Sequence, residues 1–200
     1  MVKVSIDYNG TKIEKELPES WKEVTVGQLM DISNIDMSDC EVMGEQLVKI
    51  VAYLMNVDEE VIDDIPVKQF TEITEVIKFI AQNVLPEEFA DYVEIDGEKY
   101  YLRKNFNDIR TRETIMISTL TLDKEGNNIP PLQVLDKLLC FFLLKKDEDG
   151  NLEKFHKSFI ERAQQFRNLP VEDVVGVVTF FFDGKKRSGR NTKKSLEAPK

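Results

Sequence analysis

Two segments of the chain repeat one short pattern, and this repeat limits the folds that the chain can adopt. They are VSIDYNGTKIEKELPESWKEVTVGQLMDIS at residues 4–33 and VEIDGEKYYLRKNFNDIRTRETIMIS at residues 93–118. Each opens with alternating apolar and polar residues, as expected of a strand with one buried face. Each then reaches a turn dipeptide that tolerates positive φ, Asn9-Gly10 or Asp96-Gly97. The repeat predicts two β-hairpins.

Each predicted hairpin leads into a helix through a segment with one aromatic residue, Trp21 in the first copy and Phe106 in the second. A threonine then begins each helical stretch. Thr25 is an expected N-cap, with Gln28 at the position that completes a capping box. The resulting hairpin-and-helix units are expected over residues 2–34 and 92–122.

Five further stretches have apolar residues at helical spacing or signals for the start of a helix. They cover residues 41–56, 58–63, 66–83, 131–146 and 152–167. Residues 174–182, VVGVVTFFF, follow a helix-start signal at Pro170 but are rich in β-branched residues, so helix and strand both stay open, and we favour a helix. The chain is predicted to be α+β and mostly helical, with the two hairpins as its strands.

The predicted helices differ in how far they must be buried. Residues 41–56 carry a broad apolar face that includes Val42, Met43 and Leu47 and is expected to be buried. The run LLCFFLL at residues 138–144 is apolar on all sides, so it is expected in the core or against a neighbour. We divide the chain into three regions. They are a hairpin-and-helix domain at 1–122, a helical region at 123–184 and a basic, flexible C-terminal arm at 185–200.

The sequence offers no catalytic, cofactor-binding or metal-binding set, and we expect none. His156 is the one histidine, and its charged surroundings favour a solvated role. Asp147, Asp149 and Asn151 have the alternate spacing of a calcium loop, but leucine follows where that loop requires glycine. Cys40 and Cys140 lie in apolar contexts typical of helices and are expected to be free thiols. A paired-carboxylate enzyme stays open, because the 37 acids allow no selection of two.

Charge is unevenly distributed along the chain. Residues 185–200 carry a net charge of +6, and the rest carries −16 of the total of −10. The basic residues that we consider candidates for partner binding are Lys185, Lys186, Arg187, Arg190, Lys193 and Lys194. The arm is idle, or docks on an acidic protein surface, or contacts nucleic acid. The acidic body and the scarcity of aromatic residues in the arm argue against nucleic acid.

Four aromatic residues are also candidates for partner binding. Trp21 is the lone tryptophan, and it either packs its hairpin onto the next helix or anchors an interface. Phe180, Phe181 and Phe182 precede the basic arm. Three consecutive aromatic side chains cannot all face one core from one helix, so at least one is expected to be exposed or to meet a partner.

Two segments in the first half of the chain carry a resemblance to a known family. The carrying residues are LPESWKEVTVGQLMDI, after the first hairpin, and DDIPVKQFTEITEVIKFI further on. This layout is similar to small virion or tail-assembly proteins of tailed bacteriophages that infect Bacteroidetes, including the crAss-like phages. The resemblance covers about residues 2–82. It implies a product made in the cytoplasm of the host bacterium that functions by contact with other phage proteins and carries no catalytic residues.

Two roles within this family stay open. The first, which we favour, is a virion component: a ring or connector subunit of the portal–tail region, with portal, tail or neighbouring ring subunits as partners. An acidic body and a basic arm suit a homo-oligomeric ring, because ring closure needs two different patches on each subunit. The second is a tail-assembly chaperone that binds the tape-measure or tail-tube protein through an apolar groove, formed by LLCFFLL or VVTFFF, and is absent from the virion. Neither role implies a membrane.

Overall fold

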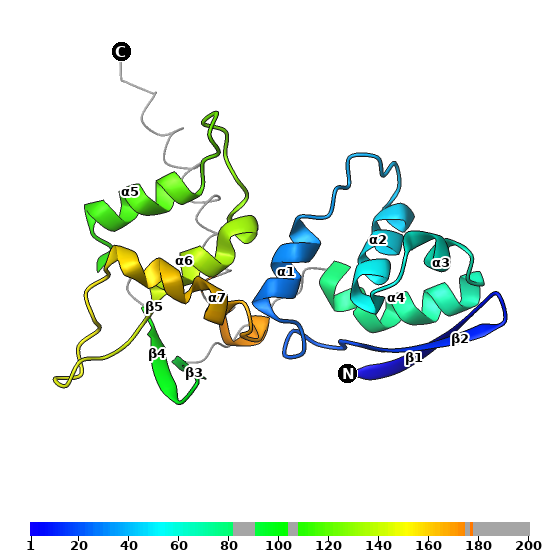
Figure 1. The fold of residues 1–200 in the computed structure, drawn as a ribbon, viewed down its shortest axis with the longest axis horizontal. Coiled ribbons are helices and arrows are strands. Elements are labelled where there is room, and N and C mark those ends of the chain that lie inside the picture. The colour runs from blue at the N-terminus through cyan, green and yellow to red at the C-terminus, as the bar shows by residue number, and fades with distance from the viewer. Residues whose placement is uncertain (82–90, 104–107, 175–176, 178–200) are drawn as a thin grey trace, which may run out of the picture.

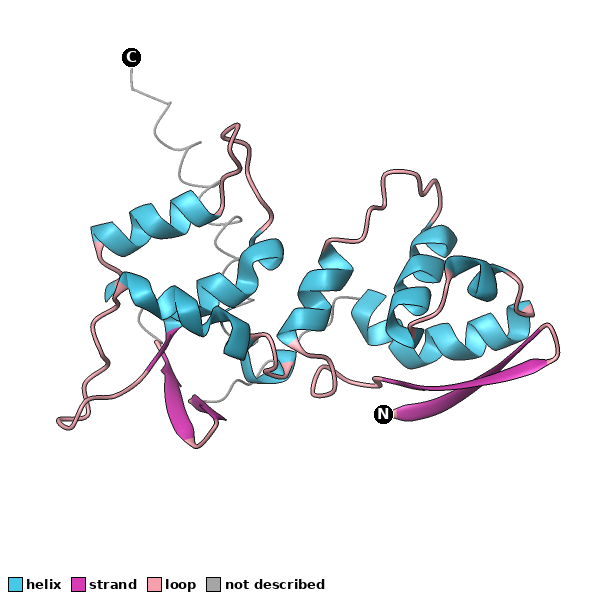
Figure 2. Ribbon diagram, in the orientation of Figure 1, coloured by secondary structure: helices cyan, strands magenta, loops and turns pink. Residues whose placement is uncertain are grey.

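The computed structural model describes residues 1–81, 91–103, 108–174 and 177 (Figures 1 and 2). The fold is α+β with mostly helix and two small antiparallel sheets, which confirms the predicted class. The first elements are β1 Val2–Tyr8, β2 Thr11–Leu17, α1 Val26–Ser33, α2 Met43–Met55, α3 Glu59–Asp63 and α4 Val67–Ala81. The later ones are β3 Tyr92–Ile95, β4 Glu98–Leu102, α5 Thr111–Leu120, η2 Pro131–Val134, α6 Leu135–Phe142, β5 Leu143–Leu144, η3 Lys157–Arg162 and α7 Ala163–Phe166. None of the helices formed by described residues is long and apolar enough to cross a membrane.

Both predicted hairpins are confirmed. In the first, β1 and β2 pair through Tyr8 and Thr11 around the turn, and in the second β3 and β4 pair through Ile95 and Glu98. All four turn residues have positive φ, from 52° to 79°. Only residues that tolerate this region can form so tight a turn, which explains the two dipeptides. The turn residues are Asn9, Gly10, Asp96 and Gly97.

The helices that follow the hairpins also begin in the same way. In α1 the third residue, Gln28, accepts the backbone N–H of Thr25 at 2.9 Å, and in α5 the third residue, Glu113, accepts that of Arg110 at 2.8 Å. Glu113 is buried and also receives both guanidinium nitrogens of Arg103, at 3.0 and 3.2 Å. This ion pair ties the residue after β4 to the start of α5. The local form of the repeat is therefore present in both copies.

The two copies differ in what surrounds them. The first hairpin is a sheet of two strands that packs on α2 and α4, whereas the second gains a third strand, β5, beside β4. Figure 1 shows the first hairpin running beneath α2–α4 and the second beside α6 and α7. Similar hairpins thus support two different hydrophobic clusters.

The two clusters divide the core differently from the predicted domains. One cluster gathers β1, β2, α2, α3 and α4 around buried residues such as Ile6 and Met55. The other joins α1, the second sheet, α6, α7 and residues up to Val177. Helix α1 follows the first hairpin in sequence but packs in the second of these clusters, so the predicted boundary after residue 122 does not separate the cores. Ile80 at the end of α4 packs against both.

Two predicted helices are wrong in part. The helix expected over residues 131–146 is a 3₁₀ turn followed by α6, and it ends at Phe142. Leu143 and Leu144 form β5 instead, paired with Leu102 and Tyr101 of β4. A short apolar run fits a buried strand as well as a buried helix, and here the open edge of the hairpin decides between them.

The helix expected over residues 152–167 is confined to its second half. Leu152 forms a bridge to Lys146 across the 147–150 turn, and helical structure begins only after His156, as the short elements η3 and α7. His156 is exposed at the start of η3, and its Nδ1 accepts the Ser158 backbone N–H at 3.3 Å. This capping contact stops the helix from extending backward.

Two smaller predictions are settled by the structure. Cys140 is buried in α6, while Cys40 lies in the loop between α1 and α2 and not in a helix, and both are free thiols. The helix start near Pro170 is confirmed, since residues 171–174 and 177 are helical. Phe106 and the remaining residues of the VVGVVTFFF run lie outside the described residues.

Candidate protein-binding groove

The start of α1 is fixed by its own capping box. The Thr25 hydroxyl accepts the Gln28 N–H at 3.1 Å, and the Gln28 side chain accepts the Thr25 N–H at 2.9 Å. Together the two bonds satisfy amides that have no partner within the helix, as the sequence predicted. They set the direction in which α1 leaves the Trp21 segment.

The same segment is joined to the C-terminal part of the chain by backbone hydrogen bonds. The amides of Val26 and Gly27 donate to the carbonyls of Leu169 and Arg167, each at 2.8 Å. The amide of Val171 donates to the Val24 carbonyl, also at 2.8 Å. Only a glycine allows this approach without a shift, because a Cβ on Gly27 would lie 3.2 Å from the Arg167 carbonyl oxygen.

A polar contact fixes the distance between α1 and α2. Asp31 of α1 accepts the Tyr53 hydroxyl of α2 and the Arg167 guanidinium, each at 2.9 Å. Arg167 also lies 3.7 Å from Asp136 of α6. Burial, reinforced by the hydrogen bond to Asp31, raises the pKa of Tyr53 to about 12, so the hydroxyl stays a donor across the neutral range. These contacts hold α1, α2 and the segment around Arg167 at fixed positions relative to one another.

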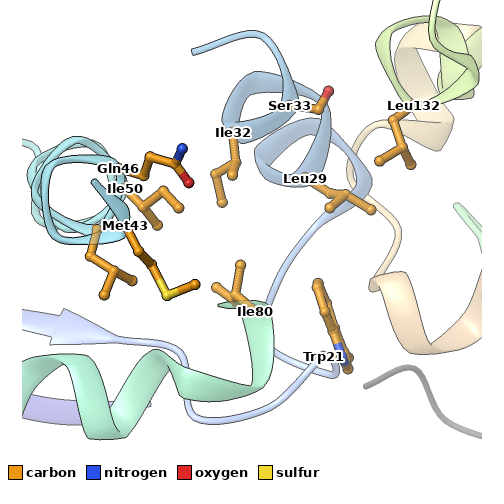
Figure 3. A pocket seen from close by; sticks show the side chains of 10 residues that line it. Trp21, Leu29, Ile32, Ser33, Met43, Gln46, Ile50, Ile80 and Leu132 are labelled. Atoms are coloured by element: carbon orange, nitrogen blue, oxygen red, sulfur yellow. The ribbon is translucent and has the colours of Figure 1, made fainter. Parts of the chain in front are cut away.

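Beside this contact, the facing sides of α1 and α2 enclose an apolar groove of about 360 Å³ (Figure 3). Its lining residues are Trp21, Leu29, Ile32, Ser33, Met43, Gln46, Leu47, Ile50, Ile80 and Leu132. In Figure 3, Ile32 of α1 lies opposite Ile50 and Met43 of α2 with Ile80 below them, and Leu29 lies on the side of Trp21 and Leu132. None of these ten side chains is acidic, basic, histidine or cysteine. The one hydroxyl among them, that of Ser33, donates to the Met30 carbonyl at 2.7 Å, and the apolar walls suit the binding of an apolar group.

Trp21 forms one end of the groove. It is 5% exposed and meets the Phe79 ring edge to face, with ring centroids 5.1 Å apart. Trp21 is therefore packed in the core, but the ring that it meets belongs to α4 and not to the next helix, α1. Its role as an interface anchor stays a prediction. Phe180, Phe181, Phe182 and the six basic candidates from Lys185 to Lys194 lie outside the described residues.

The mouth of the groove is apolar on α2 and acidic on the adjoining loop. Val42 and Met43 are 59% and 72% exposed, so the prediction that this end of the 41–56 face is buried is wrong. Residues 34–42 join the two walls and carry three exposed acids, Asp36, Asp39 and Glu41, with no basic residue among them. Lys49 of α2 holds this loop through the Asp36 carbonyl at 2.7 Å and the Asp39 carboxylate at 2.6 Å.

One of the two groove segments expected from the sequence is ruled out, and the other, VVTFFF, lies outside the described residues except for Val177. The LLCFFLL run is buried throughout, in α6 and β5, so it cannot form an exposed groove. The sequence analysis did not identify the α2 residues that line the groove. A broad apolar face indicates that a helix packs on something, but it does not indicate its partner. The one available signal was the end of that face, where Val42 and Met43 precede Gly44 and two polar residues, Glu45 and Gln46.

In the described part of the chain, a metal site would need several His, Cys, Asp or Glu side chains close together. No group of three or more His, Cys, Asp or Glu side chains there is placed to hold a metal ion. The Asp147 carboxylate accepts the amides of Asp149 and Asn151, at 3.1 and 2.8 Å, and so closes its own turn. Comparison with protein-family models, curated proteins and solved structures found no match to this chain.

Proposed function

We propose that this chain is a non-enzymatic structural protein of a tailed-phage particle, a ring or connector subunit of the portal–tail region. The observation that carries the proposal is the groove between α1 and α2, an apolar binding surface without a titratable side chain on its walls. The phage assignment itself comes from the resemblance of residues 2–82. Portal, tail or neighbouring ring subunits are the partners, and no cofactor, membrane or nucleic acid is required.

The ring role is supported by two unlike patches on one chain. A ring forms when one patch binds a different patch on the next subunit and the rotation closes. The groove with its acidic loop is one such patch. The basic residues 185–200 supply a second of opposite charge.

The groove also supports a second candidate, a tail-assembly chaperone. An apolar groove between two helices can take an amphipathic helix or extended segment of a tape-measure or tail-tube protein. A chaperone of this kind leaves before the particle matures, whereas a connector stays. The two roles therefore differ in where the chain is found.

Quantitative mass spectrometry of purified particles tests the proposal. A connector is present in a fixed number of copies per portal ring, and a chaperone is found in infected lysate but not in particles. The portal protein serves as the internal reference in both samples. Both roles would be overturned if the chain is absent from particles and also does not co-purify with any phage protein from infected lysate.

A further inference from the structure

We propose that the α1–α2 groove receives the aromatic and basic segment 180–194 of a second copy of this chain. The inference rests on the proposed assembly role and adds to it the two surfaces that meet. It makes each subunit both donor and acceptor, and such head-to-tail contacts build rings or filaments.

The first step of the argument is the chemistry of the groove. Its walls are apolar, and Met43, one of the lining residues, is 72% exposed. A surface of this kind is stabilised by removing it from water, and large aromatic side chains are the most effective anchors in such pockets. Phe180, Phe181 and Phe182 are three consecutive aromatic residues that directly precede the basic residues of the segment.

The second step is charge. The loop that joins the groove walls holds Asp36, Asp39 and Glu41, all exposed. Hydrogen bonds from Ser38 lower the pKa of Asp36, and the contact with Lys49 lowers that of Asp39, so both stay ionised at neutral pH. Two or more basic residues follow the phenylalanines within a few positions, beginning with Lys185 and Lys186. One segment thus offers aromatic anchors and then positive charge to an acceptor that offers an apolar groove and then negative charge.

Cysteine cross-linking between full-length chains tests the pairing. In a Cys40→Ser background, one variant carries Met43→Cys in the groove and the other carries Phe181→Cys in the segment. The remaining thiol, Cys140, is fully buried and does not compete. We expect a short bismaleimide to join the two variants when they are mixed. Lys186→Cys is the second donor variant, in case Phe181→Cys does not fold.

Val67→Cys is the matched acceptor control. Val67 is also an exposed apolar residue at the start of a helix, 80% accessible, and it does not line the groove. It lies about 20 Å along α4 from Ile80 at the groove base, at 1.5 Å per residue. Cross-linking of Val67→Cys as efficient as that of Met43→Cys would overturn the proposal.

Three other outcomes also overturn it. The first uses the Met43→Cys, Phe181→Cys double variant. If its two cysteines are cross-linked only within one chain, the segment occupies the groove of its own chain. In the second, two Met43→Cys chains are cross-linked to each other, which means that the grooves of two copies lie against one another. Absence of any joined species at concentrations where the chain self-associates means that another surface is used.

Charge substitution gives a second readout. Met43→Lys places a positive charge at the groove mouth and should repel a basic segment, whereas Val67→Lys adds the same charge elsewhere. We expect self-association to weaken by about tenfold or more for Met43→Lys, the range of an interface anchor, and to change little for Val67→Lys. Equal effects of the two variants would contradict the proposal.

Failure of this inference can be told from failure of the proposed function. A chain that is present in particles but does not form the cross-link keeps the assembly role and loses this interface. A chain that forms the cross-link but is absent from particles keeps the interface and loses the connector role.

Discussion

Gly27 and Gly44 occupy the same position, the second residue of a helix, in α1 and α2. A Cβ on Gly27 would lie 3.2 Å from the Arg167 carbonyl oxygen, and one on Gly44 would meet nothing within 4 Å. Gly44→Ala should therefore gain the usual helix preference of alanine, about 0.5–1 kcal/mol. We expect Gly27→Ala to be less stable than Gly44→Ala by about 1 kcal/mol or more, because the backbone contact must open. Urea unfolding measures the free energy of unfolding of both variants. Equal values would show that the contact between Gly27 and Arg167 opens at no measurable cost.

Trp21 has two predicted roles that one substitution separates. Its side chain is buried against Phe79 in the cluster that contains α1 and α6. Trp21→Ala should lower the free energy of unfolding by about 3–5 kcal/mol, as expected for a large core side chain. Thermal melting and self-association are measured on the same sample. A variant that melts like the parent but no longer associates would assign Trp21 to the interface instead of the core.

At the scale of elements, the contact between α1 and α2 should depend on alkaline pH. The pKa of Tyr53 is raised from 10 to about 12 in the folded chain, so the folded state holds this proton more tightly than the unfolded state. Its stabilisation is complete below pH 10 and is lost as pH rises toward about 12. We expect the melting temperature of the parent to fall more steeply over this range than that of Tyr53→Phe, which has no proton to lose.

The control for this pH effect is Tyr8→Phe, which removes a hydroxyl from the first hairpin, away from Asp31. Its melting curve should follow the parent across the same pH range. If Tyr53→Phe also follows the parent, the hydrogen bond to Asp31 does not hold the two helices together.

The elements that could be predicted from the sequence are those with local signals. The turn dipeptides and the Thr25–Gln28 box act within a few residues, and the structure confirms them. The strand at Leu143–Leu144 could not be predicted, because it depends on the open edge of β4 some forty residues earlier in the chain. The late helix start after His156 likewise follows from a side-chain cap that an apolar periodicity does not reveal.

At the scale of the whole molecule, the groove shows why a site is harder to predict than a helix. Its walls come from α1 and α2, its base from Ile80 and one side from Leu132. The spacing of these walls is set by Asp31, Tyr53 and Arg167, and the last of these is 136 residues from Asp31. Sequence patterns indicate which faces are apolar, but a contact at this separation decides which face stays open.

The last prediction concerns the charge of the whole chain. Residues 185–200 carry +6 against −16 on the rest, and their composition holds too few apolar residues to add a core of their own. Deleting them should leave the melting temperature nearly unchanged and weaken self-association. Association of the full-length chain should also fall with added salt, because exposed charges are screened over about 8–10 Å near physiological ionic strength. Analytical ultracentrifugation across a salt series measures both effects. A truncated chain that associates at full strength would contradict the assembly role of the arm, as would a full-length chain whose arm cross-links to DNA and to no protein.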